Sequence, residues 1–188
     1  MVFCIGLSAR LPGYGGIHFA DRFWADVPVT THNNDRQRSD DQRQAQGVGQ
    51  QQAGQQGKKV GGLETAQSQI DILFNSQTLQ RQANLLYCAI SDIEKGIEQS
   101  KRLIAAYEKQ DLDAMLQLME ERDGNSCDPL PGEMEAMLDN RNKAWVEKMP
   151  AIMTEAPTLF VVGAGHLPGD NGVLNLLKQQ GYTIEAMK

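Results

Sequence analysis

The segment from residue 35 to residue 59 constrains the fold most, because it cannot join a hydrophobic core. It reads DRQRSDDQRQAQGVGQQQAGQQGKK, with nine glutamines and no Leu, Ile, Phe, Trp or Tyr. Such a composition buries too little apolar surface to offset the entropy cost of ordering the chain. We therefore expect residues 30–57 to be disordered or at most a mobile helix. The chain then divides into an atypical, Gln-rich part, residues 1–57, and a regular part, residues 58–188.

The regular part shows alternating strand and helix patterns. KVGGLE at 59–64 predicts a short strand, and Thr65 is a suitable N-cap for the helix that follows it. Apolar residues at spacings of three, four and seven predict one long amphipathic helix over 77–108. The further expected elements are a helix after Asp111, a helix over 132–149, a strand over 158–162, a helix over 169–180 and a strand over 182–187. This order indicates an α/β arrangement with a helical insertion.

Length and charge exclude several classes of partner. The chain has 188 residues, enough for one ordinary domain, and a formal net charge of -6. An acidic chain lacks the basic face that nucleic acid requires, so no nucleic-acid partner is expected. No apolar run approaches the roughly 20 residues of a membrane-spanning helix. The opening MVFCIGLSA is a poor export signal, because no Lys or Arg precedes its apolar residues.

The cysteines are few and scattered. Cys4, Cys88 and Cys127 form no CxxC pair and no cluster with histidine, which excludes zinc-finger and thioredoxin-type sites. In an oxidising compartment Cys88 and Cys127 would pair as a disulfide. Two unpaired thiols, one of them buried, are an equally supported alternative.

A histidine within VVGAGHLPGDNG, residues 161–172, is the leading candidate for a functional residue. A strand is expected to end just before Gly163 and a helix to begin near Asp170. His166 would therefore lie at the carboxyl edge of the sheet, where open α/β folds bind their ligands. Gly163 and Gly165 would allow a tight turn and leave space beside the imidazole. An ordinary packed or surface histidine is the alternative.

Two charged residues are candidates for the same edge. Glu64 follows a strand-like run, and a carboxylate there would ligate a metal or act as a general base toward water. A solvated glutamate at a helix start is the alternative interpretation. Arg141 lies on the apolar face of its helix, four residues from both Met137 and Trp145. It would either grip a carboxylate with two hydrogen bonds or cover Trp145 with its stem.

Four segments resemble, in order, the C-terminal two-thirds of the TraB/GumN family. They read KKVGGLETAQSQIDIL, AAYEKQDLDAMLQLM, LDNRNKAWVEKM and TLFVVGAGHLPGDNGVLNLLKQQGYTIE. The family includes exported bacterial proteins and relatives of the animal TIKI metalloproteases. The resemblance implies an α/β core with a mixed sheet, similar to that of erythromycin-esterase-like and ChaN-like proteins. Because the front half departs from the family pattern, we expect this core to be incomplete at its N-terminus, through truncation or a shifted reading frame.

The resemblance implies a metal-dependent, peptidase-like hydrolase that uses a divalent ion such as Mn, Co or Zn. Family members carry two GxxH motifs and an acidic residue. The second GxxH corresponds to Gly163 and His166, and the acidic residue corresponds to Glu64. The first GxxH matches His18 in letters only, so His18 is the weakest of the three expected metal ligands.

Arg141 and Asn142 match the Arg-Asn pair of the family, which makes Arg141 a candidate catalytic residue beside Glu64 and His166. The implied substrate is a peptide or a small molecule. The implied location is the periplasm or the exterior, and the lack of a convincing signal peptide keeps the cytoplasm as the alternative. The alternative function is a non-catalytic remnant or binding module, which would expose apolar surface or cover it in a homodimer.

Overall fold

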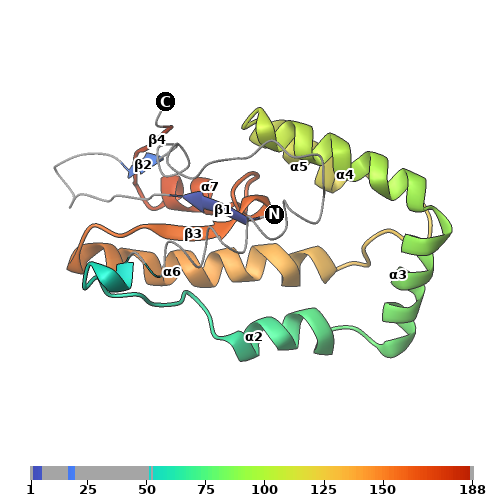
Figure 1. Cartoon of the computed structure of the whole chain (residues 1–188), viewed down its shortest axis with the longest axis horizontal. Coiled ribbons are helices and arrows are strands. Elements are labelled where there is room, and N and C mark those ends of the chain that lie inside the picture. The colour runs from blue at the N-terminus through green and yellow to red at the C-terminus, as the bar shows by residue number, and fades with distance from the viewer. Residues whose placement is uncertain (1, 6–16, 20–50, 52, 187–188) are drawn as a thin grey trace. The chain divides into compact units, whose positions relative to one another are not determined.

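The computed structural model describes residues 2–5, 17–19, 51 and 53–186 (Figure 1). This part of the chain is mostly helical, with short strands that pair two by two. It divides into two compact units. The first contains the described residues up to 63 together with 149–163 and 182–186, and the second contains 64–148 and 164–181.

The first unit contains two separate strand pairs. Strand β1, Val2–Ile5, pairs antiparallel with strand β3, Phe160–Gly163. Phe160 and Val162 are buried whereas Val161 is exposed, which is the alternation of a strand with one buried face. Strand β3 is the strand that the sequence predicts ahead of the histidine motif.

The second strand pair is parallel and joins β2, Ile17–Phe19, to β4, Ile184–Ala186. No described strand belongs to both pairs, so a single mixed sheet is not formed by the described residues. The strand predicted at 59–64 is wrong, because residues 58–62 adopt no regular structure. Gly61 and Gly62 explain the error, since glycines offer no side chain to pack and weaken a strand.

Most of the Gln-rich segment lies outside the described residues. Residues 51 and 53–55 are helical, and Gly57 closes this stretch with a positive φ of 64°. The expectation that residues 1–57 are largely disordered can therefore be compared with the structure only where this part is described, and there the chain forms β1, β2 and this helical stretch.

Three helices of the second unit, α2 (Ala66–Ile70), α3 (Leu79–Ser91) and α5 (Leu112–Glu120), begin at residues whose side chains cap them. The unit also contains α4 (Ile93–Glu108) and α7 (Val173–Gln179), and α6 (Asn140–Glu155) is divided between the units. The side chains of Thr65, Thr78 and Asp111 each accept a hydrogen bond from a main-chain N–H in the following turn. The predicted caps Thr65 and Asp111 are thus confirmed.

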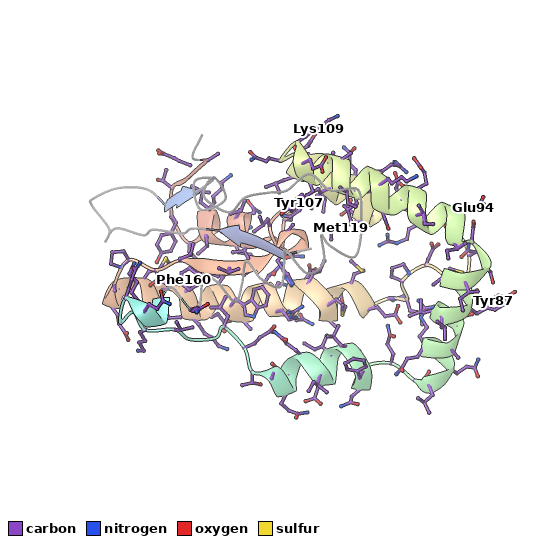
Figure 2. The ribbon with its side chains drawn as sticks, in the orientation of Figure 1. Tyr87, Glu94, Tyr107, Lys109, Met119 and Phe160 are labelled. Atoms are coloured by element: carbon purple, nitrogen blue, oxygen red, sulfur yellow. A yellow bond between two sulfur atoms is a disulfide. The ribbon has the colours of Figure 1, made fainter. Side chains whose placement is uncertain are left out.

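The long helix predicted over 77–108 is two helices instead. Asp92 has a φ of -132° and a ψ of 54°, outside the helical region, and it separates α3 from α4 (Figure 1). Aspartate is a poor interior helix residue because its carboxylate competes for nearby main-chain groups. The side chains of Tyr87 and Glu94 project outward on either side of this break (Figure 2). The exposed apolar residues of the two helices are Leu79, Leu86, Tyr87, Ile90, Ile93 and Ile97.

Helix α6 supplies much of the buried apolar surface. Trp145, Val146, Met149 and Met153 are all buried along one side of it. The helix predicted over 132–149 starts with a π-helical turn, Glu135–Asp139, and continues beyond Pro150 to residue 155. Among the described residues, no helix combines the length and the apolar character that crossing a bilayer requires.

Candidate functional site

Trp145 is the centre of a cluster that contains the predicted site residues of the second unit. The tryptophan is buried, and its indole Nε1 donates to Glu64 Oε2 at 3.3 Å. On the ring itself, the His166 imidazole packs at a centroid distance of 4.5 Å and a tilt of 46°. The Arg141 guanidinium lies 4.9 Å from the ring centroid, in cation–π geometry. The structure therefore brings Glu64, Arg141 and His166 together around one indole.

Arg141 makes both of the contacts that the sequence left as alternatives. Its Nε donates to Glu64 Oε2 at 3.1 Å and its Nη2 donates to Glu64 Oε1 at 2.6 Å. The guanidinium also lies over the indole of Trp145, because residues four apart share one face of a helix. A third N–H, on Nη1, donates to the Met137 carbonyl at 2.9 Å.

The Glu64 carboxylate accepts four hydrogen bonds. Oε1 accepts from Arg141 and, at 2.8 Å, from Gln69 Nε2, whereas Oε2 accepts from Arg141 and Trp145. Burial raises the pKa of this carboxyl, but the hydrogen bonds from Arg141 and Gln69 and the charge of Arg141 outweigh burial and hold the pKa below its ordinary value. Since a carboxylate has about four lone-pair positions, Glu64 is saturated as an acceptor.

His166 ends a short 3-10 turn, Ala164–His166, and is 7% exposed. Its Nδ1 lies 2.7 Å from Asn142 Oδ1. The pKa of the imidazole is lowered to about 4. Burial is the largest cause, and the positive charge of Arg141 also lowers the pKa, whereas the Glu64 carboxylate raises it by less. The imidazole is therefore neutral at pH 7.

The loop after His166 differs from the sequence expectation. The helix predicted from residue 169 begins at Val173, because Gly172 adopts an extended φ of -71° and ψ of 149°. A Cβ atom at Gly172 would lie 2.2 Å from the Leu167 and Pro168 carbonyl oxygens, so a side chain cannot fit without a main-chain shift. At Gly165, the space that was expected beside the imidazole belongs to Met119, whose Cε would lie 3.0 Å from a Cβ atom.

The sequence interpretation also missed polar residues around the site. Gln69 supports Glu64, and Asn171 accepts a hydrogen bond from the Asn142 side chain through its carbonyl. The position of Gly172 in the glycine-rich motif could have indicated that no side chain fits there. Gln69 and Asn171 carry no such sign, because a polar residue in a helix or loop has many surface alternatives.

The described residues do not on their own fit a divalent metal. They contain no group of three His, Cys, Asp or Glu residues that could hold an ion, and Glu64 has no free acceptor position. His166 Nε2 makes no hydrogen bond to a described residue. Nε2 is therefore the nitrogen of this imidazole that has no partner among the described residues. One open donor is fewer than the three that catalytic zinc sites use.

His18 belongs to the other unit and lies within β2, where its main chain is in register with Glu185. Its side chain lies outside the described residues, so its assignment as a metal ligand stays a prediction. Gly163 ends β3, directly before the turn that carries His166.

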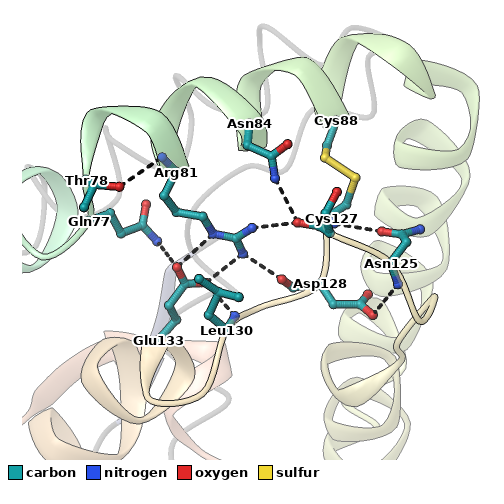
Figure 3. A network of polar contacts seen from close by, with 11 residues as sticks. Gln77, Thr78, Arg81, Asn84, Cys88, Asn125, Cys127, Asp128, Leu130 and Glu133 are labelled. Carbon is teal, nitrogen blue, oxygen red and sulfur yellow. Dashed lines mark hydrogen bonds and ion pairs between the residues drawn. A yellow bond between two sulfur atoms is a disulfide. The ribbon is translucent and has the colours of Figure 1, made fainter.

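A second arginine that binds a glutamate, Arg81, lies in the second unit, and the sequence interpretation did not single it out (Figure 3). Arg81 is 8% exposed, and its Nε and Nη2 donate to the two oxygens of Glu133 at 3.0 and 2.9 Å. Its Nη1 and Nη2 also donate to the Ser126 and Asp128 carbonyls. The arginine thereby attaches helix α3 to the loop that follows α5.

A disulfide joins Cys88 of α3 to Cys127 of the same loop, with a Cα–Cα distance of 5.8 Å. The Asp128 carboxylate accepts hydrogen bonds from the main-chain N–H groups of residues 123–125, and these bonds lower its pKa. The loop is thus held by a covalent bond at one residue and by charge-assisted hydrogen bonds at the next.

Comparison with protein families gives one match. The model described as the TraB/PrgY/gumN family matches residues 24–186. The match begins well before residue 58, so it includes part of the segment that the sequence interpretation set apart as atypical. Comparisons with curated proteins and with solved structures gave no match.

Proposed function

Because the chain belongs to the TraB/PrgY/gumN family, we propose that it is a metal-dependent, peptidase-like hydrolase centred on His166. The observation that carries this proposal is the state of His166, a neutral imidazole whose Nδ1 is paired with Asn142 and whose Nε2 makes no hydrogen bond to a described residue. Such a nitrogen keeps its lone pair at neutral pH and suits either metal ligation or proton transfer. An α/β core of the erythromycin-esterase-like and ChaN-like kind is part of the same proposal.

The neighbouring residues have distinct proposed roles. Arg141 uses three of its five N–H groups on described partners, and the remaining ones would bind the substrate carbonyl or stabilise the negative charge that develops on its oxygen. Glu64 holds Arg141 and Trp145 in place, because its own acceptor positions are filled. The metal would be Mn, Co or Zn with His166 as one ligand. We assign no step to the ion, since the described residues supply no second open donor.

The substrate that fits this proposal is a peptide or a small molecule with a hydrolysable carbonyl group. The proposed location is the periplasm or the exterior, which the Cys88–Cys127 disulfide supports, because disulfides persist in oxidising compartments.

Metal content and hydrolysis, measured on the same samples, test the proposal. The full chain is loaded separately with Mn, Co and Zn, freed of excess ion and assayed with a mixed peptide library. We expect stoichiometric metal and peptide cleavage in the wild type and the loss of both in His166→Ala. The matched control is His32→Ala, because no motif includes His32. Unchanged metal content in His166→Ala would overturn the proposal.

A non-catalytic binding module is the second candidate. The observation that favours it is the combination of a saturated Glu64 with the lack of any three-ligand cluster among the described residues. It predicts a folded chain that retains no ion and cleaves no peptide under the same assay. Its exposed apolar helix residues would then bind a partner or a second copy of the chain.

A further inference from the structure

A chain of polar groups leads away from the Nδ1 side of the His166 ring. Nδ1 lies 2.7 Å from Asn142 Oδ1. The Asn142 Nδ2 donates to the main-chain carbonyl of Asn171 at 2.8 Å, and the Asn171 Nδ2 donates to Asp139 Oδ2 at 2.9 Å. Three separate elements thus contribute to one line of hydrogen bonds: α6, the π-helical turn before it and the loop before α7.

The carbonyl of Asn171 decides which way the Asn142 amide faces. A main-chain carbonyl can only accept, so the Asn142 atom beside it must be the nitrogen. A reversed amide would place two oxygens 2.8 Å apart. Oδ1 must therefore face the imidazole. The orientation follows from a group of unambiguous chemistry, which is not the case for most asparagine amides.

The orientation of Asn142 in turn locates the proton on His166. An amide oxygen only accepts, so Nδ1 must carry the hydrogen in the 2.7 Å contact. A neutral imidazole has one N–H group, which leaves the lone pair on Nε2, the nitrogen without a described partner. Trp145 packs against the ring and resists a ring flip that would exchange the two sides.

Burial makes this arrangement rigid. Asn142 is 2% exposed and His166 is 7% exposed, so water cannot replace either partner freely. Rotation of the buried Asn142 amide would bring its oxygen against the Asn171 carbonyl oxygen and its NH2 group against the Nδ1–H of His166. The hydrogen bond to Asp139 fixes the Asn171 side chain, and so helps to hold the segment whose carbonyl orients Asn142.

We propose that Asn142, supported by Asn171 and Asp139, is a positioning residue that holds His166 in the Nδ1–H tautomer and keeps the lone pair on Nε2. Only the use of that lone pair, as a ligand or a base, rests on the proposed function. The tautomer itself depends on the hydrogen bonds alone.

Nitrogen NMR of the full chain labelled at histidine tests the tautomer directly. At pH 7 we expect the His166 Nδ1 to show the shift of a protonated nitrogen and Nε2 that of an unprotonated one. In Asn142→Leu the acceptor is lost, and the spectrum should move toward the Nε2–H form. Asn142→Gln keeps an amide that can accept from Nδ1 and donate to the Asn171 carbonyl, and it should retain the wild-type tautomer, which also covers the case in which the leucine variant fails to fold.

Kinetics separate the two proposals. If the chain hydrolyses peptides, kcat should fall roughly 10- to 100-fold in Asn142→Leu with little change in KM, and Asn142→Gln should recover most of it. The expected tautomer in a chain without any hydrolysis would support the positioning role and contradict the proposed function. An Nε2–H tautomer in the wild type, or an unchanged spectrum in a folded Asn142→Leu variant, would overturn the positioning role whatever the activity.

Discussion

Two arginines of the second unit, the buried Arg81 and the half-buried Arg141, hold a glutamate in the same way, but in different surroundings. Each donates Nε and Nη2 to the two oxygens of its partner, Glu133 or Glu64. Each carboxylate also accepts two further N–H groups, so both glutamates are saturated. The ion pair alone therefore does not distinguish a structural cluster from a candidate site.

The remaining donors and neighbours make the difference. Arg81 makes two more hydrogen bonds to the carbonyls of a loop that a disulfide also holds (Figure 3). Arg141 makes one more, to the Met137 carbonyl in the π-helical turn before its helix, and lies over Trp145 beside His166. The first arrangement uses the guanidinium to fix main chain. The second leaves N–H groups of the guanidinium without a described partner, next to an imidazole whose Nε2 has no described partner either.

The causes of the pKa shifts show the same contrast. At Glu133 the hydrogen bond from Arg81 is the largest cause and lowers the pKa, ahead of the opposing effect of burial. At Glu64 burial is the largest single cause and raises the pKa, although the hydrogen bonds and charge together outweigh it. The carboxylate beside His166 is thus the more strongly desolvated of the two, as is common where side chains line a reactive site.

Removal of the disulfide should have the largest effect, and it should be confined to the Arg81 cluster. Cys88 and Cys127 are 39 residues apart, and a loop of that length gives a stabilisation of about 4 kcal/mol by constraint of the unfolded chain. We expect the double variant Cys88→Ala/Cys127→Ala to lose that much free energy of unfolding in urea. The His166 NMR signals should stay unchanged.

Reductant provides the matched control for this prediction. The wild type in excess reductant should unfold at the same urea concentration as the double variant, and the double variant should not respond to reductant. A wild-type midpoint that is indifferent to reductant would show that the disulfide does not stabilise this cluster.

Acid should have the next largest effect, and it should act at the Trp145 cluster. The imidazole of His166 titrates near pH 4 when folded and near its ordinary value of 6.5 when unfolded. Between these values the unfolded chain binds a proton that the folded chain does not, so the free energy of unfolding falls as the pH falls from about 6.5 to about 4. The loss is roughly 3 kcal/mol in total. Urea unfolding across this range measures it.

The variant His166→Gln is the control for the acid effect, because glutamine does not titrate. The difference in the free energy of unfolding between wild type and variant should change with pH over this window and become constant above it. An NMR titration of His166 with a midpoint near 6.5 would contradict the buried, neutral imidazole on which the site description depends.

Local features of the sequence predicted local structure well. Thr65 and Asp111 cap the helices that follow them, because a cap needs only the next three residues to form its hydrogen bond. The long apolar period over 77–108 failed at Asp92, since the period records a shared face and carries no information about a change in direction. The pairing of the strands could not be predicted either, because it depends on segments that are far apart in the chain.

The residues of the cluster around Trp145 could be predicted from the sequence, but the contacts between them could not. Glu64, Arg141 and His166 were identified from their types and positions, and they do gather around Trp145. The sequence could not predict that Glu64 is saturated, because this requires four N–H groups from three separate residues to converge on one carboxylate. Arg81 was missed for a similar reason: its partner Glu133 lies 52 residues away, and an arginine in a polar helix ordinarily faces solvent.

Replacement of each glutamate by glutamine should have the smallest effect on stability and the clearest effect on the comparison. Glu64→Gln removes the negative charge opposite Arg141. It also places an amide nitrogen, which can only donate, where N–H groups meet the carboxylate of the wild type. The pair is partly exposed, so the cost should lie between that of a surface pair and a buried one, about 1 to 2 kcal/mol. Because Glu64 raises the pKa of His166 and Arg141 lowers it, the variant should titrate at a pH below that of the wild type.

Glu133→Gln is the matched change at the other arginine. It should weaken the loop that Arg81 holds and leave the His166 titration where it is, because Glu133 is not among the groups that shift that pKa. An NMR titration of both variants, with urea unfolding on the same samples, compares the two clusters directly. If both variants shifted His166 equally, the imidazole would be responding to general destabilisation, and the assignment of Glu64 and Arg141 to its electrostatic environment would have to be abandoned.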